Sequence, residues 1–487
     1  MEQDSAVAGL MLYPAASASN ERLSNATQIQ KTRSFVSVKG VTTPAPQDKG
    51  YPGFLTNEEF IIFERFHKEV YSRSKDFRST VFSFASAHEE VEYALCRWLR
   101  ARKFILSDTI KMVKEAMECS AGARTHNFYP CPDKALCVER SLYIKNFPQV
   151  YYGHAKNGCP VYISQPGLFN AEKIMTLTNV SSIINYHWYA QMYEFSKKLD
   201  EMRLSQNGGF KRYECVCIID LARLTSKQLN KTAISVAKEQ SAIDSLCFPE
   251  TLSKLLIINA PTFFTVFWRA VRRWLDQRTT DKIEVVGTNR TKLLKSLSEV
   301  IEVGMLPSDF GGNGMSIKSF MKKEMVEAYE KKGDGNGLKL VNENDCLIHV
   351  KGACTRRINV DAKKIVKLSF VTKAESKCAV QIIDSNNKVL SEIEVMHRRI
   401  GSEDEYSELP TRYNMEDYGL TLKGPEIYEI CLVAATTTKI DIVMVEREFV
   451  VDEKQKNPKE MLPQSSHPNS LRSARSICAG SFHRVDE

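Results

Sequence analysis

Large aromatic side chains are concentrated in the stretch from Phe248 to Gly287. An apolar run that ends at Pro261 predicts a strand buried on both faces, and Ile283–Val286 predicts another. A helix-period segment lies between them. At about 100° per residue, its largest apolar side chains fall within one wide arc. They are Phe263, Phe264, Phe267, Trp268, Val271, Trp274 and Leu275.

The opposite side of this helix is cationic, with Arg269, Arg272 and Arg273. Two interpretations are open. The helix either packs its aromatic face on the core, or acts as a movable lid with aromatics over an apolar cavity and arginines toward an anionic surface. The residues that flank the helix must decide between them.

Motifs for catalysis are scarce. The chain has no Gly-rich phosphate loop after a strand, no GxSxG, no HExxH and no DFG-like set. Its nine histidines do not cluster, and of its 13 cysteines only Cys215 and Cys217 are closely spaced. The sequence therefore favours binding over catalysis and predicts no metal ion and no cofactor. A Rossmann-like enzyme is an alternative that lacks its nucleotide loop.

The composition is typical of a soluble globular protein with two or three domains, at 487 residues, 43% hydrophobic and 26% charged. The net charge of +8 permits contact with an anionic membrane. Because the basic residues are dispersed, we expect no nucleic-acid binding. No apolar run approaches the roughly 18 residues of a spanning helix. Scattered cysteines without a secretion signal indicate a cytoplasmic protein with reduced thiols.

The chain divides into six parts. Residues 1–55 lack periodicity and are predicted to be disordered, as are residues 452–487. A capping box at Thr56–Glu59 opens a predicted helical bundle over residues 56–130, in which Arg97, Arg100, Arg102 and Lys103 crowd one helix end.

Residues 131–314 alternate strands with helices, which predicts an α/β domain with several parallel strand pairs. Residues 315–337 are predicted to be a linker. Residues 338–451 shift toward period two and predict an all-β sandwich.

Several motifs together resemble a known family. In chain order they are Leu99–Phe104, Phe147–Gln149, Gly158–Tyr162, Ile219–Leu221, Pro249–Glu250, Ile257–Pro261 and Phe310–Gly312. They resemble the CRAL-TRIO lipid-binding family, in particular its phosphatidylinositol/phosphatidylcholine transfer proteins, over roughly residues 56–314. By position and strand pattern, residues 338–450 look like the GOLD β-sandwich of some members.

The resemblance implies a multidomain fold, with a helical bundle against an α/β CRAL-TRIO domain and a GOLD-like sandwich behind it. It also implies a non-enzymatic carrier that holds one phospholipid in an apolar pocket and exchanges it at membranes through a gating helix. The residues that it assigns to the pocket and gate are Tyr162, Cys215, Cys217, Phe263, Phe267, Trp268, Val271 and Trp274.

The resemblance also assigns a head-group site. Arg102, with Lys103 beside it, would contact the phosphate, and Glu250 would accept hydrogen bonds from inositol hydroxyls. Thr279 and Lys282 complete the set. Cations suit a phosphodiester, whereas a carboxylate and a hydroxyl suit a polyol.

Two departures concern the second ligand. Where phosphatidylcholine-binding members carry small hydroxyl residues, this chain has Cys215 and Cys217, and Ser164 and Gln165 replace a frequent pair of glutamates. The resemblance therefore favours phosphatidylinositol with another apolar ligand as its alternate. The leading prediction is a lipid transfer protein, cytoplasmic and peripheral at intracellular membranes. The alternative is a lipid-sensing adaptor whose GOLD-like domain recruits a protein partner in trafficking or signalling.

Overall fold

A computed structural model describes most of the chain between residues 48 and 451. The described ranges are 48–83, 89–206, 209, 211–225, 228, 231–264, 268, 280–332, 338–372, 377–396, 421–434 and 439–451. Four predicted site residues lie outside them, namely Phe267, Val271, Trp274 and Thr279. Residues 1–47, the linker residues 333–337 and residues 452–487 also lie outside, with the predictions made for them.

Five helices form the N-terminal bundle. They are α1 (Asn57–Ser72), α2 (Lys75–Ser83), α3 (Val91–Ala101), α4 (Leu106–Cys119) and α5 (Ala121–Thr125). The predicted capping box begins α1, because the Thr56 and Glu59 side chains each accept a hydrogen bond from the other residue's backbone N–H. Trp98 is fully buried, and its indole N–H donates to the Val81 carbonyl at 3.1 Å.

A mixed five-stranded sheet forms the centre of the α/β half of the chain, over residues 131–314. Its order is β1 (Gln149–His154), β2 (Pro160–Ser164), β3 (Cys215–Asp220), β4 (Leu252–Ile258) and β5 (Ile283–Val285). Strands β2 to β5 are parallel, whereas β1 pairs antiparallel with β2. The α/β prediction is therefore confirmed. Strand β1 was not predicted, because the turn residues Asn146–Pro148 stand directly before it.

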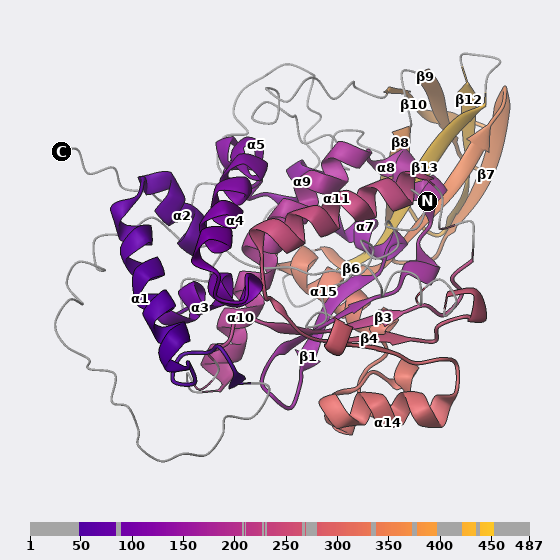
Figure 1. Cartoon of the computed structure of the whole chain (residues 1–487). Helices are drawn as coiled ribbons and strands as arrows, with labels where there is room; N and C mark the ends of the chain where they lie inside the picture. The colour runs from indigo at the N-terminus through magenta and orange to yellow at the C-terminus, as the bar shows by residue number, and fades with distance from the viewer. Residues whose placement is uncertain are drawn as a thin grey trace, which may run out of the picture.

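Helices connect and cover this sheet (Figure 1). Before and beside it lie α6 (Pro132–Leu136), α7 (Arg140–Asn146), α8 (Ala171–Leu177), α9 (Val180–Tyr189), the π-helical turn η5 (Ala190–Glu194) and α10 (Phe195–Ser205). Helix α11 (Lys231–Cys247) joins β3 to β4, and α14 (Arg290–Val300) follows β5. Among the described helices, none is both long and apolar enough to cross a membrane.

The C-terminal part is an antiparallel sandwich, which confirms the all-β prediction. Its strands are β6 (Leu338–Val350), β7 (Ala353–Val360), β8 (Lys364–Thr372), β9 (Lys377–Ile383), β10 (Val389–Met396), β11 (Thr421–Lys423), β12 (Glu426–Ala434) and β13 (Ile440–Val451). One sheet has the order β10-β9-β12-β7 and the other β11-β8-β13-β6. Helix α15 (Ile317–Lys332) leads into it from the α/β half.

Residues 48–55 differ from the sequence prediction. They were expected to belong to a disordered segment, but Tyr51 is only 8% exposed and contacts both the bundle and the start of β3. Polar composition suggested disorder, whereas one aromatic ring between the buried Arg100 and the half-buried Arg212 holds the backbone in place. This contact depends on residues far away in the sequence.

Buried ion pairs join the sandwich to the α/β half. The Arg447 side chain on β13 is 4% exposed and contacts Glu343 at 2.5 Å and Glu139, the residue before α7. The Asp345 carboxylate on β6 forms ion pairs with the ammonium groups of Lys145 on α7 and Lys173 on α8, each at 2.7 Å. Figure 1 shows the orange and yellow sandwich on the side of the sheet away from the indigo helices.

Replacing Arg447 with Met should loosen this junction. The variant leaves the buried Glu343 carboxylate without its closest cation, so we expect a loss of about 3 kcal/mol in the protection of β6 and β13. Native-state hydrogen exchange measures this loss. The control is Arg357→Met, because the Arg357–Glu429 pair lies on the sandwich surface, with arginine 77% exposed. The control should lose less than about 1 kcal/mol. Equal losses would contradict the prediction.

Candidate lipid head-group site

A carboxylate between two cations forms the centre of the candidate site. Glu250 stands in the turn between α11 and β4, and Lys282 stands directly before β5. The Lys282 ammonium lies 3.2 Å from the Glu250 carboxylate, and the Arg100 guanidinium lies 3.5 Å from the same carboxylate. Two neighbouring strands and the end of α3 therefore meet at one acidic side chain.

The backbone at Glu250 is unusual. Its φ is +57°, the left-handed region that favours glycine and costs other residues about 1–2 kcal/mol. Residues held in this region often belong to functional sites, where the surroundings impose the conformation. Here Arg97 donates to the Pro249 carbonyl at 3.1 Å, so α3 holds the turn on both sides of the Pro249–Glu250 bond.

Arg100 is the residue that the sequence analysis did not select. The prediction named Arg102 for the phosphate, yet Arg102 is half-buried and donates to the carbonyl of Ala101, and Lys103 is exposed. The buried cation at Glu250 is Arg100, 3% exposed. One signal was present in the sequence, because the i, i+3 spacing of Arg97 and Arg100 puts them on one helix face.

The neighbours of Arg100 keep its guanidinium charged. Burial lowers the pKa of Arg100, but Tyr51, Glu250 and Glu214 outweigh it, so the pKa is raised above its usual value. Glu214 lies 3.5 Å from Arg100 and accepts a hydrogen bond from the Tyr51 hydroxyl. Burial and Glu214 raise the pKa of Tyr51, so this phenol remains a donor at neutral pH.

The predicted pocket residues of the sheet lie in one row. Tyr151, Tyr162 and Cys217 are register partners across β1, β2 and β3, and Cys215 lies on the same face with its sulfur 3.5 Å from that of Cys217. Both cysteines are fully buried and Tyr162 is partly buried. Within the described part of the chain, the buried Tyr151 hydroxyl has no hydrogen-bond partner.

The start of the predicted gating helix is described only at Phe263, Phe264 and Trp268. Phe264 is 1% exposed, whereas Phe263 is 45% exposed. Trp268 is partly buried and packs against the main core. Phe263 is thus more exposed than Phe264 and Trp268, and the rest of the aromatic arc lies outside the described residues.

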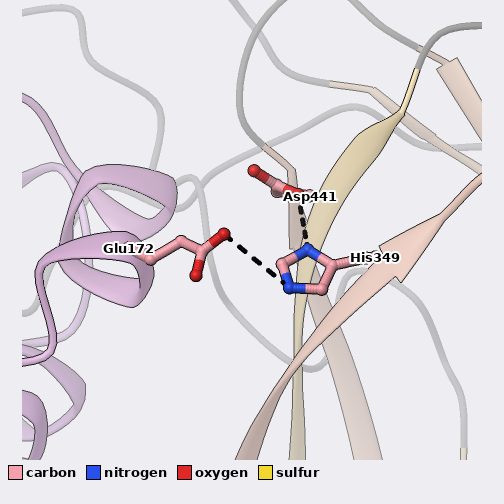
Figure 2. Close-up of side chains that lie close together, drawn as sticks. All are labelled: Glu172, His349 and Asp441. Atoms are coloured by element: carbon pink, nitrogen blue, oxygen red, sulfur yellow. Dashed lines mark hydrogen bonds and ion pairs between the residues drawn. The ribbon is translucent and has the colours of Figure 1, made fainter.

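A histidine with two carboxylates lies where the sandwich meets α8 (Figure 2). His349 of β6 contacts Asp441 of β13 at 2.8 Å and Glu172 of α8 at 3.7 Å. These groups could ligate a metal ion. However, the Lys439 ammonium lies 3.4 Å from Asp441 and 3.7 Å from Glu172, so a cation of the chain already neutralises both carboxylates. The arrangement is better explained as an ion-pair cluster between domains.

A second histidine pairs with a buried carboxylate between α9 and α11. His187 contacts Asp244 at 2.7 Å, and Gln191 of the turn η5 bonds to the same oxygen. Burial raises the pKa of Asp244 to about 6, against the opposing effect of His187. A His–Asp pair can support acid–base chemistry, but these contacts also brace α9 and η5 against α11, as a purely structural bond would.

The strained turn leads to a stability prediction. Glu250→Gly and Glu250→Ala both remove the carboxylate, but only alanine keeps the cost of positive φ. We expect the glycine variant to unfold with a free energy higher by about 1 kcal/mol. Urea denaturation of the two variants, compared directly, measures the difference. An alanine variant at least as stable as the glycine variant would show that the turn carries no strain.

Comparisons with known proteins agree with the sequence resemblance. Residues 144–312 match the CRAL/TRIO domain family. The chain is 31% identical over 225 residues to the phosphatidylinositol/phosphatidylcholine transfer protein SFH12 of Arabidopsis thaliana, covering 45% of this chain and 39% of the relative. It is 31% identical over 229 residues to SFH13 of the same plant, covering 46% and 35%.

A yeast relative is matched over more of its length. The chain is 27% identical over 270 residues to the SEC14 cytosolic factor of Kluyveromyces lactis, covering 55% of this chain and 83% of the relative. By contrast, it spans about two fifths or less of the two plant relatives. The chain thus carries a CRAL/TRIO domain at residues 144–312, within a segment similar to phosphatidylinositol/phosphatidylcholine transfer proteins.

Proposed function

We propose that this protein is a non-enzymatic lipid carrier that holds one phosphatidylinositol-type lipid and exchanges it at membranes. The observation that carries the proposal is the Glu250 carboxylate, held between Arg100 and Lys282 in a strained turn. The transfer function printed in the names of the SFH12 and SFH13 relatives supports it.

The chemistry of this site suits an inositol phosphate. A carboxylate flanked by two cations stays ionised and accepts hydrogen bonds from ring hydroxyls, since an ionised carboxylate is an acceptor only. Lys282, at the edge of the cluster and partly exposed, would contact the phosphodiester together with Arg102 and Lys103. The Thr279 hydroxyl would join Glu250 at the polyol. The polyol and the phosphate are thus bound by different side chains.

The acyl chains explain why such a carrier needs a gate. Exposing each CH₂ to water costs about 0.8 kcal/mol, so two chains make unassisted diffusion through water very slow. The segment between β4 and β5 combines aromatics with four arginines, which suits contact with an anionic leaflet. We propose that it opens at the membrane surface, to which the protein binds peripherally from the cytoplasm.

The alternate ligand would lie against the tyrosine and cysteine row of the sheet. Thiols are weak hydrogen-bond donors, so Cys215 and Cys217 present a largely apolar surface. The buried Tyr151 hydroxyl without a partner among the described residues would accept or donate one hydrogen bond. An apolar lipid with a single polar group fits this combination better than a zwitterionic head group.

The sandwich supports a second role. Its sheet β10-β9-β12-β7 faces away from the buried ion pairs of Arg447 and Asp345, which lie on β6 and β13 of the other sheet. We propose that this GOLD-like domain presents its outer sheet to a protein partner, as an adaptor would.

Lipid extracted from the purified protein tests the head-group site. In Glu250→Ala/Lys282→Ala, the phosphatidylinositol share of bound lipid should fall about tenfold, because hydrogen bonds to charged groups contribute about 1.5–3 kcal/mol. Mass spectrometry after incubation with vesicles of phosphatidylinositol and phosphatidylcholine measures that share.

The matched control is Lys254→Ala/Glu284→Ala. This ion pair joins the same strands β4 and β5 at 3.1 Å, and its removal changes the charge identically. The control should retain the wild-type share. A wild-type protein without phosphoinositide, or equal loading in the Glu250/Lys282 variant, would refute the proposed site.

The gate is tested by exchange rather than by binding. Trp268→Ala/Trp274→Ala should hold the inositol lipid as well as wild type but transfer it between vesicles several-fold more slowly, because aromatic side chains anchor at the membrane interface. Fluorescent-lipid transfer gives the rate, with Tyr71→Ala on α1 as a control. An unchanged rate would mean that the two tryptophans only pack.

A further inference from the structure

Residues 48–54, here named the N-terminal strap, run over the end of α3. The Tyr51 ring lies between two guanidinium groups, with Arg100 at 3.8 Å and Arg212 at 4.1 Å from its centroid. Cation–π contacts of this kind are strongest where water is excluded, and Tyr51 is only 8% exposed. The ring therefore fixes the plane of the Arg100 guanidinium from one side.

Polar contacts fasten the strap at both ends of this ring. The Tyr51 hydroxyl donates to Glu214, a residue 3% exposed at the start of β3, and Asp48 forms an ion pair with Arg212. Gly50, at φ +78°, lies so close that an added Cβ would be 3.0 Å from the Arg100 side chain. The backbone at Gly50 and the Tyr51 ring therefore contact Arg100 directly, and the Tyr51 hydroxyl contacts its ion-pair partner Glu214.

Arg100 stands between two carboxylates, Glu214 and Glu250. Because the strap contacts Glu214 and the head-group site contains Glu250, Arg100 connects the strap to that site. It lies 3.5 Å from Glu214 and 3.5 Å from Glu250. The Tyr51 hydroxyl occupies part of the acceptor capacity of Glu214, which leaves the guanidinium available to Glu250. Without Tyr51, Arg100 would regain rotamer freedom and a stronger alternative partner.

We propose that Tyr51 is a positioning residue that sets head-group selectivity by holding Arg100 against Glu250. The inference rests on the proposed function, because it concerns the same inositol-type head group. It extends the site to the strap, outside the matched residues 144–312. Tyr51 contacts Arg100 and not Glu250, so its effect falls on the orientation of the carboxylate and leaves the acyl-chain contacts unchanged.

The test compares head-group share with total lipid in full-length variants. Tyr51→Leu removes ring and hydroxyl but stays apolar, and should lower the phosphatidylinositol share about fivefold at unchanged total lipid, in proportion to one buried cation–π contact. Tyr51→Phe keeps the ring between the arginines and should recover most of the share. Phe54→Leu, an exposed position of the same strap, is the control and should match wild type.

Each outcome supports or overturns either the positioning role of Tyr51 or the proposed function. A wild-type share in folded Tyr51→Leu, or an equal loss of share and total lipid, would overturn the positioning role. If wild type itself holds no inositol lipid, the proposed function fails. If Glu250→Ala/Lys282→Ala loses the share while Tyr51→Leu keeps it, only this inference fails.

A second variant covers the case in which Tyr51→Leu does not fold. Arg212→Met removes the outer cation and the Asp48 ion pair while Arg100, Glu214 and Glu250 remain. The loosened strap should lower the inositol share about twofold, as expected for one weaker contact. A folded Arg212→Met protein with the wild-type share would overturn the proposal.

Discussion

A buried guanidinium must be neutralised where it lies, because an unpaired charge in a protein interior costs more than the surrounding packing can offset. Arg100 meets this constraint with Glu214, Glu250 and the Tyr51 ring. Those partners come from the start of β3, the turn before β4 and the strap. One charge at the end of α3 thus specifies how the helical bundle, the sheet and the N-terminal segment fit together.

The same constraint operates at the other end of the molecule. Arg447 is neutralised by Glu343 of its own sandwich and by Glu139 of the α/β half. Apolar contacts also join the two parts of the chain. Val371, Val443 and Val445 of the sandwich belong to the core that runs through the sheet and bundle. The remaining sandwich residues form a core of their own. Apolar burial contributes most of the energy, whereas the arginines specify which surfaces meet.

Sequence patterns predicted the elements of this fold better than their contacts. The apolar runs at Cys215–Ile219 and before Pro261 identified β3 and β4, since buried parallel strands have continuous apolar stretches. The segment 177–204, by contrast, is not one continuous helix, because Asn179 caps a new helix and η5 adds a π turn. Capping and local hydrogen bonds of this kind leave the hydrophobic period almost unchanged, so periodicity does not reveal them.

In the candidate site, too, the sequence predicted some residues but not the long-range contacts that hold them. Family spacing selected Glu250 and Lys282, and the structure brings these two together. It did not select Arg100, which lies inside α3 on the face of Arg97, whereas Arg102 caps the end of that helix. Nor could it select Tyr51, because a ring that stacks between Arg100 and Arg212 depends on contacts with residues far away in the sequence. Long-range polar contacts of single residues leave no periodic signal in a sequence.

The arrangement around Glu250 has a consequence for selectivity under the proposed function. A carboxylate fixed between two cations has acceptor oxygens and no donor, so it stabilises a head group with hydroxyl donors. A head group without donors would displace water from this carboxylate and give nothing in return, and an unpaired buried polar group costs about 1–3 kcal/mol. Rejection of the wrong lipid would therefore come from the preorganised Glu250, and the strain and ion pairs that hold it are the cost of that discrimination.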